Sequence, residues 1–170
     1  MEGKVLRGEK RPDHKTALLD FTKEDPWRVF RIMAEFVESF ETMSKQGPLI
    51  PIFGSARLKP ETEYYQSAEK LAGMLVKQGY GILSGGGPGI MQAANEGAGE
   101  ERSFGLNITL PYEQTSNHVV ANSNKLINFY YFFVRKLNFV AESDAMVAFP
   151  GGFGTMGFGL GAAIGAAVGT

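Results

Sequence analysis

A short apolar run that ends in a glycine-rich turn, VAFPGGFGT at residues 147–155, most constrains how this chain can fold. An uninterrupted apolar run is typical of a strand that is buried on both faces of a parallel sheet. Glycines directly after such a strand let the backbone approach a ligand that side chains would keep away. The pattern predicts a buried strand followed by a ligand-binding turn, and the expected ligand group is a phosphate.

A second turn of the same kind, SGGGPGIM at residues 84–91, follows a short apolar run and precedes a helical pattern. Successive backbone N–H groups in such a turn, with the positive end of a helix behind them, form a cradle for an anion. Glycines also serve ordinary tight turns, so one such turn alone is weak evidence. Two turns on one sheet predict a single nucleotide-sized ligand. The G-x-G-x-x-G pattern of dinucleotide-binding oxidoreductases does not follow the first predicted strand.

Predicted strands and helices alternate through most of the chain. Strands are expected at residues 49–53, 81–83, 104–110 and 126–134, and helices at residues 60–78, 89–97 and 137–143. Such alternation implies a parallel sheet with right-handed crossovers. We therefore predict an α/β fold, a Rossmann-like three-layer sandwich with a parallel sheet, plus an N-terminal helical arm.

The N-terminal arm and its amphipathic helix are assigned to residues 1–46, and the Rossmann-like nucleotide-binding domain to residues 47–170. A helix is expected from Asp25 to about Lys45. Its apolar residues recur at helical spacing, at Trp27, Phe30, Met33, Val37 and Phe40. Two interpretations stay open: the helix packs on its own domain, or its aromatic residues contact another subunit. We expect a homodimer or a higher homo-oligomer.

Composition excludes several classes of function. A net charge of -1 gives no basic excess, so neither nucleic acid nor a membrane surface is an expected partner. The absence of cysteine excludes disulfides and thiolate chemistry and fits a cytoplasmic protein. The histidines, His14 and His118, are too few and too far apart in sequence for a histidine-rich metal site. No secretory signal is expected, and we expect no metal and no other cofactor.

Polar residues that follow the predicted strands are candidates for ligand contact. They are Ser55 and Arg57 after the first strand, Ser84 in the second turn, and Glu113, Gln114 and Asn117 in a long polar connection, which would read a base or ribose. Each also has an ordinary explanation as a turn or solvated residue.

Arg135 and Lys136 stand at an expected helix N-terminus, where the helix dipole disfavours cations. Either a bound anion or a structural salt bridge would compensate. Ligands of open parallel sheets sit outside the carboxyl ends of the strands, where Arg135 is expected together with both glycine turns.

Five segments, in their order and spacing, resemble the LONELY GUY family: SGGGPGIM with AANEGA, GLNITLPYEQTSN, FFVRK and PGGFGT. Members are cytokinin-activating phosphoribohydrolases and related nucleotide 5'-monophosphate nucleosidases, also labelled lysine decarboxylase-like. The match runs from about residue 50 to residue 156. The resemblance implies hydrolysis of the N-glycosidic bond of a nucleoside monophosphate such as AMP, giving free base and ribose 5-phosphate. No lysine is marked as an anchor for pyridoxal phosphate, so the decarboxylase label has no physical support.

The resemblance also implies roles for individual residues. Arg135 matches the catalytic arginine of the family and Lys136 its companion. The nucleotide and its phosphate would be held by Gly151, Gly152, Gly154, Thr155, Gly85, Gly86, Gly87 and Ser55.

One residue departs from the family pattern. Cleavage of a glycosidic bond passes through an oxocarbenium-like state that calls for a carboxylate, and the family pattern PGGxGTxxE supplies one. Phe158 occupies that position here. Three hypotheses follow: the natural protein carries a glutamate there, which we favour; the chain is an inactive nucleotide-binding or carrier protein; or another carboxylate acts instead. Candidates for the last are Glu113, Glu142 and Asp144, although the latter two precede the final strand and are expected to lie away from its carboxyl end.

The segment after residue 156, GFGLGAAIGAAVGT, has no polar side chain before its terminal threonine. As a helix it would lose about 1 kcal/mol for each internal glycine relative to alanine. We interpret it as a truncated, substituted or misassigned segment.

Overall fold

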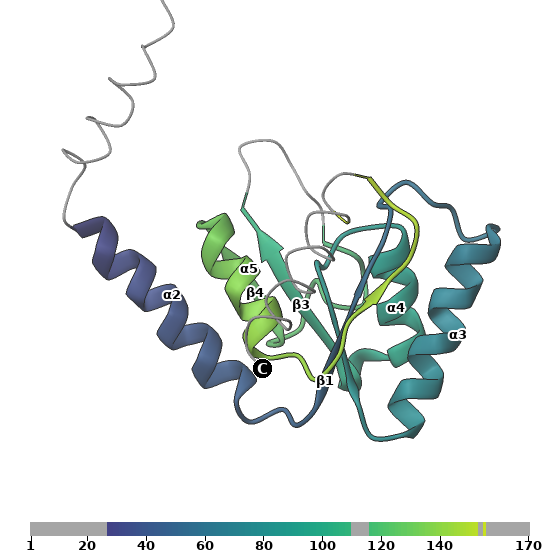
Figure 1. Ribbon diagram of the computed structural model, residues 1–170, viewed down its shortest axis with the longest axis horizontal. Helices are drawn as coiled ribbons and strands as arrows, with labels where there is room; N and C mark the ends of the chain where they lie inside the picture. The colour runs from purple at the N-terminus through teal and green to yellow at the C-terminus, as the bar shows by residue number, and fades with distance from the viewer. Residues whose placement is uncertain (1–26, 110–115, 153–154, 156–170) are drawn as a thin grey trace, which may run out of the picture.

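The computed structural model of the protein describes residues 27–109, 116–152 and 155 (Figure 1). Residues 1–26, 110–115, 153–154 and 156–170 lie outside the described residues, and they include the expected arm, the start of the polar connection and the tail. Glu113, Gln114, Gly154 and Phe158 belong to these stretches.

The described part of the chain builds one five-stranded parallel sheet. Its strands are β1 (Leu49–Phe53), β2 (Gly81–Ser84), β3 (Ser103–Ile108), β4 (Leu126–Phe129) and β5 (Val147–Ala148), in the order β4-β3-β2-β1-β5. Every neighbouring pair is parallel. On one side of β1 the sheet continues with β2, β3 and β4, and on the other side β1 pairs with β5. The α/β Rossmann-like fold predicted from the alternation of elements is confirmed.

Helices cover both faces of the sheet and complete three layers (Figure 1). The helices α3 (Glu63–Lys77) and α4 (Ile90–Ala98) lie on one face, and α2 (Trp27–Met43) and α5 (Phe132–Ala141) lie on the other. A short 3-10 helix, η1 (Glu100–Arg102), leads into β3. Each face has its own apolar core, centred on Phe129 and Phe139 under α5 and on Ile82 and Ile90 under α4.

Pro51 lies inside β1, although a central strand normally excludes proline because the residue has no N–H to donate. The main-chain bonds of Leu49 to Asp144, and of Phe53 to Phe149, point toward the β5 side of β1. Alternate residues of a strand bond to the same side, so the nitrogen of Pro51 also faces β5. Pairing with β5 begins only at Ile52, and the proline therefore interrupts no ladder bond.

The amphipathic helix α2 uses a different stripe for packing than its apolar spacing indicated. Ile32, Phe36 and Met43 pack against the core cluster beneath α5. The recurring residues of the sequence pattern are exposed instead, at Phe30, Met33, Val37 and Phe40. The helix does pack on its own domain, and the exposed stripe is the surface that would supply a contact between subunits. The homo-oligomer stays a prediction.

The predicted strand over residues 126–134 is wrong in its second half. Strand β4 ends at Phe129, and α5 begins at Phe132. The aromatic run YYFF has a high intrinsic strand propensity, but tertiary contacts override it: the carboxylate of Glu35 accepts hydrogen bonds from the N–H groups of Tyr130 and Tyr131. Arg135 is consequently the fourth residue of α5 and not its N-terminus.

The close approach of α3 and α4 predicts that Gly97 is essential for packing. A Cβ atom on Gly97 would collide with the backbone carbonyl of Glu69. We expect Gly97→Ala to lower the free energy of unfolding by about 1–3 kcal/mol, although alanine favours a helix over glycine by about 1 kcal/mol. The measurement is urea denaturation. Gly73→Ala on α3 is the comparison: its Cβ would lie 3.3 Å from the Gly97 carbonyl oxygen, a tight contact that a shift of a few tenths of an ångström relieves, so we expect a smaller loss than for Gly97→Ala. A Gly97→Ala variant more stable than the parent would contradict the prediction.

Candidate ligand-binding site

Three loops meet at the carboxyl edge of the sheet, where the order of the strands reverses between β1 and β5. Ser55 leaves β1, Pro150 follows β5, and Ile90 opens α4 after the glycine turn of β2. The N–H of Ser55 donates to the carbonyl of Pro150 at 3.2 Å, and the N–H of Ile90 donates to the carbonyl of Ser55 at 3.0 Å. Because such a reversal is the usual ligand crevice of an open α/β sheet, these loops form the candidate site.

Glycines in these loops serve two different purposes. Gly89 has a φ of 69°, which side chains rarely adopt, and a Cβ atom there would collide with the carbonyl of Ser55. A Cβ atom on Gly151 would collide with Thr155 and lie 3.1 Å from the carbonyl carbon of Gly54. The packing of the protein itself explains both glycines. Gly152 differs, because a Cβ atom there would meet nothing within 4 Å, so its backbone borders open space at the crevice.

A buried network of hydrogen-bonded polar side chains anchors the glycine turn after β2. Ser84 Oγ accepts from the N–H of Gly86 at 3.0 Å and donates to Asn95 Oδ1 at 2.7 Å. Asn117 Nδ2 donates to Asn95 Oδ1 and to the carbonyl of Gly87, both at 3.0 Å. The N–H of Asn117 donates to the carbonyl of Gly86 at 2.7 Å. The turn is therefore fixed before any ligand arrives.

This network corrects two expectations from the sequence. Ser84 was a candidate phosphate donor and Asn117 a candidate reader of a base or ribose. Both side chains are buried and point into the network, so they anchor the loop. Sequence reasoning missed Asn95, which is fully buried at the centre of the network. The available indication was an amide among the small apolar residues of AANEGA, on the face of α4 that packs on the sheet.

Arg135 lies against the same turn and is 8% exposed. Its Nε donates to the carbonyl of Leu106 in β3 at 2.6 Å. A guanidinium nitrogen and Met91 Sδ each lie 2.7 Å from the position that a Cβ atom of Gly85 would take, so a side chain at residue 85 would displace one or both of them. The guanidinium carbon lies 5.7 Å from the ring centre of Phe132 and 5.2 Å from that of Phe139.

Burial determines the electrostatics of this position. It lowers the pKa of Arg135 to about 10, because the charged form loses solvation. The guanidinium stays charged at neutral pH. The structure thus holds a buried cation beside a fixed glycine turn, an arrangement that favours an anionic ligand.

The other predicted site residues are spread around this centre. Lys136 follows Arg135 and is half-buried, about 100° further around the helix axis. Ser55 is half-buried, and its Oγ accepts from the N–H of Arg57, whose side chain is exposed. Thr155 is half-buried and packs on Gly151. The structure brings Gly85 and Arg135 into contact, and it joins the loops of Ser55 and Gly151.

Two candidate carboxylates lie at the opposite edge of the sheet, as the sequence predicted. Asp144 Oδ2 accepts from the N–H of Leu49 at 3.1 Å, at the amino end of β1. Glu142 directly follows the C-terminal end of α5, and burial raises its pKa. Both side chains are therefore remote from the glycine turns.

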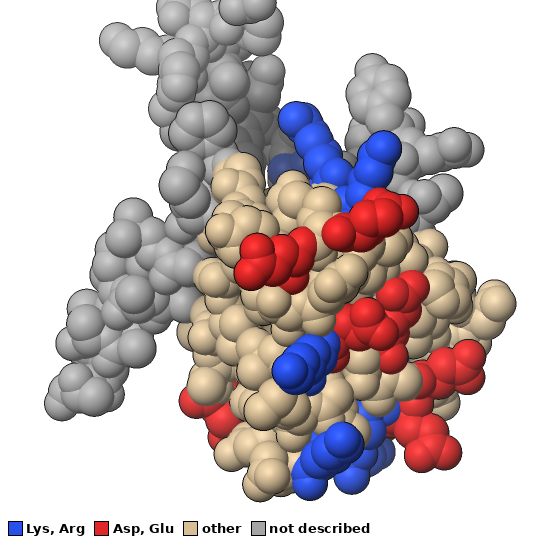
Figure 2. All heavy atoms as spheres, turned by 90° about the vertical axis from the view of Figure 1, so that its right-hand side faces the viewer, with Lys and Arg blue, Asp and Glu red and all other residues tan. Residues whose placement is uncertain are grey.

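Cavities described in the structure lie elsewhere. One of about 500 Å³ lies between α2 and the start of α5, one of about 470 Å³ between α3 and α4, and one of about 260 Å³ beside Lys125. The face that α3 and α4 form carries both acidic and basic side chains (Figure 2). Within the described ranges, no group of three or more acidic or histidine side chains is arranged to hold a metal ion. No helix in this part of the chain is long and apolar enough to cross a membrane.

Comparison with known proteins supports the architecture. The model of the SLOG cluster4 family matches residues 48–164. A comparison with curated proteins gave no match.

Three solved structures share the fold. The protein TM1055 is 23% identical, with a TM-score of 0.54 and 68% of each chain covered. A molybdenum cofactor binding protein from the phototrophic bacterium Rippkaea orientalis is 24% identical, with a TM-score of 0.55, covering 69% of this chain and 71% of that one. The molybdenum cofactor carrier protein of Chlamydomonas reinhardtii is also 24% identical with a TM-score of 0.55, covering 70% and 72%.

The buried network predicts a stability role for Asn117. We expect Asn117→Ala to lower the free energy of unfolding by about 1–3 kcal/mol, because Asn95 Oδ1 and the carbonyl of Gly87 lose a buried donor. Urea denaturation measures the change. Asn122→Ala, in the same segment but exposed, is the control and should stay within about 0.5 kcal/mol. Equal effects of the two substitutions would contradict the structural role.

Proposed function

The chain belongs to the SLOG cluster4 family, and we propose that the loops at the carboxyl edge of its sheet form the site of a nucleoside 5'-monophosphate phosphoribohydrolase. Family membership confirms the resemblance to the LONELY GUY group. The observation that carries the proposal is the contact of the buried Arg135 guanidinium with the glycine turn at Gly85. A charged group beside glycine turns at the carboxyl edge of the sheet is an arrangement that suits a phosphate ester.

The proposed binding step uses residues of both loops. The phosphate lies against the turn after β5, where Gly152 borders open space, and Thr155 adds a hydroxyl donor beside Gly151. Ser55 and the turn formed by Gly85, Gly86 and Gly87 line the rest of the site. The cation of Arg135 faces the ribose and phosphate from α5, with Lys136 as its companion. AMP is the simplest ligand with all of these groups.

The hydrolytic step makes a further demand. Water adds to the anomeric carbon, the bond to the base breaks, and its electron pair leaves with the base, which takes up a proton. A carboxylate accepts the proton of the water or stabilises the oxocarbenium-like state. Phe158 stands where the family pattern has glutamate, and its ring does neither. Hydrolysis therefore requires a carboxylate at this position or a substitute for it.

A second candidate function is that of a carrier which binds a nucleotide-like ligand without cleaving it. Two observations favour it: Phe158 itself, and the names of two proteins with the same fold, which are described as a binding protein and a carrier for the molybdenum cofactor. Both candidates use the same site. They differ in whether the glycosidic bond breaks.

Removal of Arg135 tests the binding step. We expect Arg135→Ala to weaken AMP binding about 10- to 100-fold, because a charge-assisted contact is lost, and Arg135→Lys to retain part of the affinity. Isothermal titration calorimetry measures binding, and a thermal melt of each variant checks folding. Arg102→Ala is the control, because Arg102 is exposed and precedes β3 at the opposite edge of the sheet. A folded Arg135→Ala variant with unchanged affinity would contradict the proposed site.

Restoring the carboxylate of the family pattern at residue 158 distinguishes the hydrolase function from the carrier function. We expect Phe158→Glu to release free adenine from AMP, detected by chromatography, while the chain with Phe158 binds AMP and leaves it intact. The control is Phe158→Gln, which is matched in size and lacks the charge. Intact mass and peptide mapping establish residue 158 in each sample. Binding without base release from Phe158→Glu would favour the carrier, and base release from the chain with Phe158 would mean that another group supplies the carboxylate.

A further inference from the structure

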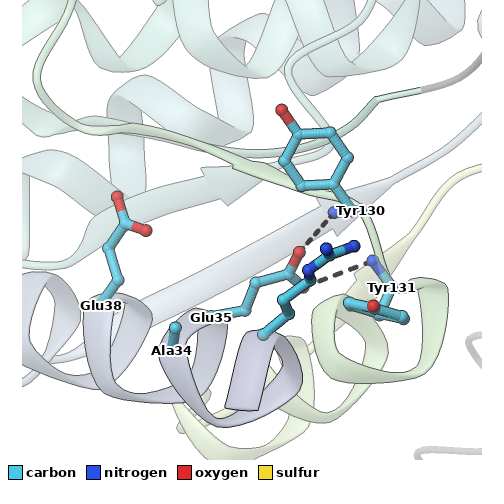
Figure 3. Close-up of a pocket in the computed structure, with 6 residues that line it drawn as sticks. Ala34, Glu35, Glu38, Tyr130 and Tyr131 are labelled. Carbon is cyan, nitrogen blue, oxygen red and sulfur yellow. Dashed lines mark hydrogen bonds between the residues drawn. The ribbon is translucent and has the colours of Figure 1, made fainter. Parts of the chain in front are cut away.

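Glu35 joins two elements that are distant in the sequence. It lies on α2, and its Oε1 accepts from the N–H of Tyr130 at 2.8 Å while its Oε2 accepts from the N–H of Tyr131 at 3.3 Å (Figure 3). Both donors are backbone groups at the turn between β4 and α5. One carboxylate therefore holds the entry into α5 with both of its oxygens.

Helix α5 has no cap of its own. Tyr131 occupies the N-cap position and makes no side-chain cap bond, and the first turn contains no acidic residue. A helix start usually satisfies its free N–H groups with a serine, threonine, aspartate or asparagine at this position. A negative charge there also interacts favourably with the helix dipole. Glu35 bonds the N–H of the N-cap residue and of the residue before it, so from another helix it fixes the entry into α5 and places a negative charge at its start.

A short chain of bonds connects this cap to the proposed site. The N–H of Tyr131 donates to Glu35, and the carbonyl of Tyr131 accepts from the N–H of Arg135 at 3.2 Å. From Arg135 the side chain continues to the carbonyl of Leu106. A shift in the first turn of α5 would move the Arg135 backbone relative to β3 and so disturb the bond to Leu106.

We propose that Glu35 is a positioning residue for Arg135: it fixes the first turn of α5 and so sets the guanidinium against the glycine turn. The carboxylate also offsets the unfavourable interaction of the Arg135 and Lys136 charges with the dipole at this end of the helix. The proposal rests on the proposed function only where a ligand is used as the readout.

The neighbourhood offers a matched control. Glu35 and Glu38 both line the cavity of about 500 Å³ between α2 and the start of α5. Glu38 is one turn further along α2, and its carboxylate lies apart from the N–H groups of Tyr130 and Tyr131 (Figure 3). Loss of Glu38 removes the same charge from the same cavity and leaves the cap in place.

The first readout needs no ligand. In the ¹⁵N-labelled full chain, the Nε–H signal of Arg135 is assigned by its loss in Arg135→Lys, and its hydrogen exchange rate reports the bond to Leu106. We expect Glu35→Ala to raise this rate about tenfold or more, since a charge-assisted bond pair is lost. Glu35→Gln, which keeps one acceptor oxygen, should have a smaller effect, and Glu38→Ala should have none. Gly97→Ala serves as a control for general destabilisation, because it acts through the opposite face of the sheet.

The second readout is AMP affinity in a double-mutant cycle. We expect Glu35→Ala to weaken binding about fivefold or more in the parent chain and to have no further effect in the Arg135→Ala background. Unchanged Nε–H exchange in a folded Glu35→Ala variant would overturn the proposal, as would a loss of affinity that is the same in both backgrounds. Should Glu35→Ala fail to fold, Glu35→Gln carries the same exchange test. If the parent chain does not bind AMP, the proposed function fails, and the exchange measurement still decides the role of Glu35.

Discussion

The burial of one permanent charge governs the architecture around the carboxyl edge of the sheet. The Arg135 guanidinium is almost fully enclosed, and a buried charge is costly unless its surroundings supply compensating contacts. The carbonyl of Leu106 and two aromatic rings provide some of them. The absence of a side chain at Gly85 provides the space. The glycine turn after β2 is thus shaped as much by its neighbouring cation as by any ligand.

The glycine turn and the Arg135 cation are held by two separate sets of contacts, one on each face of the sheet. Asn95 on α4 and Asn117 fix the turn from one side through a buried network. Helix α5, with Glu35 at its start, presents the cation from the other side. The geometry of the site therefore depends on the sheet that lies between these two groups of contacts and that helices cover on both faces.

Much of the fold was predictable from local patterns. Apolar runs located the strands, with glycine directly after β1 and β2, and their alternation with helices indicated the parallel topology that the structure shows. The order of motifs indicated the family, which the match over residues 48–164 confirms. Local patterns failed at the aromatic run after Phe129, where strand propensity competes with a cap supplied from another helix. They also failed for Ser84 and Asn117, since a polar residue beside a glycine turn has the same appearance in sequence whether it faces a ligand or the interior. Asn95 was indicated only by an amide among small apolar residues, and Glu35 by nothing, because the roles of both exist only once distant segments meet.

The cap from Glu35 also affects how the chain folds. Tyr130 lies 95 residues after Glu35, so α5 gains its starting contact only after a large loop closes. Until then the segment LINFYYFFV carries no charge, no proline and a high strand propensity, the composition of a segment prone to intermolecular strand pairing. Docking of α2 converts this segment into a short strand and a helix. Because α2 precedes this segment in the chain, it is synthesised first, and Glu35 is available when the aromatic run emerges.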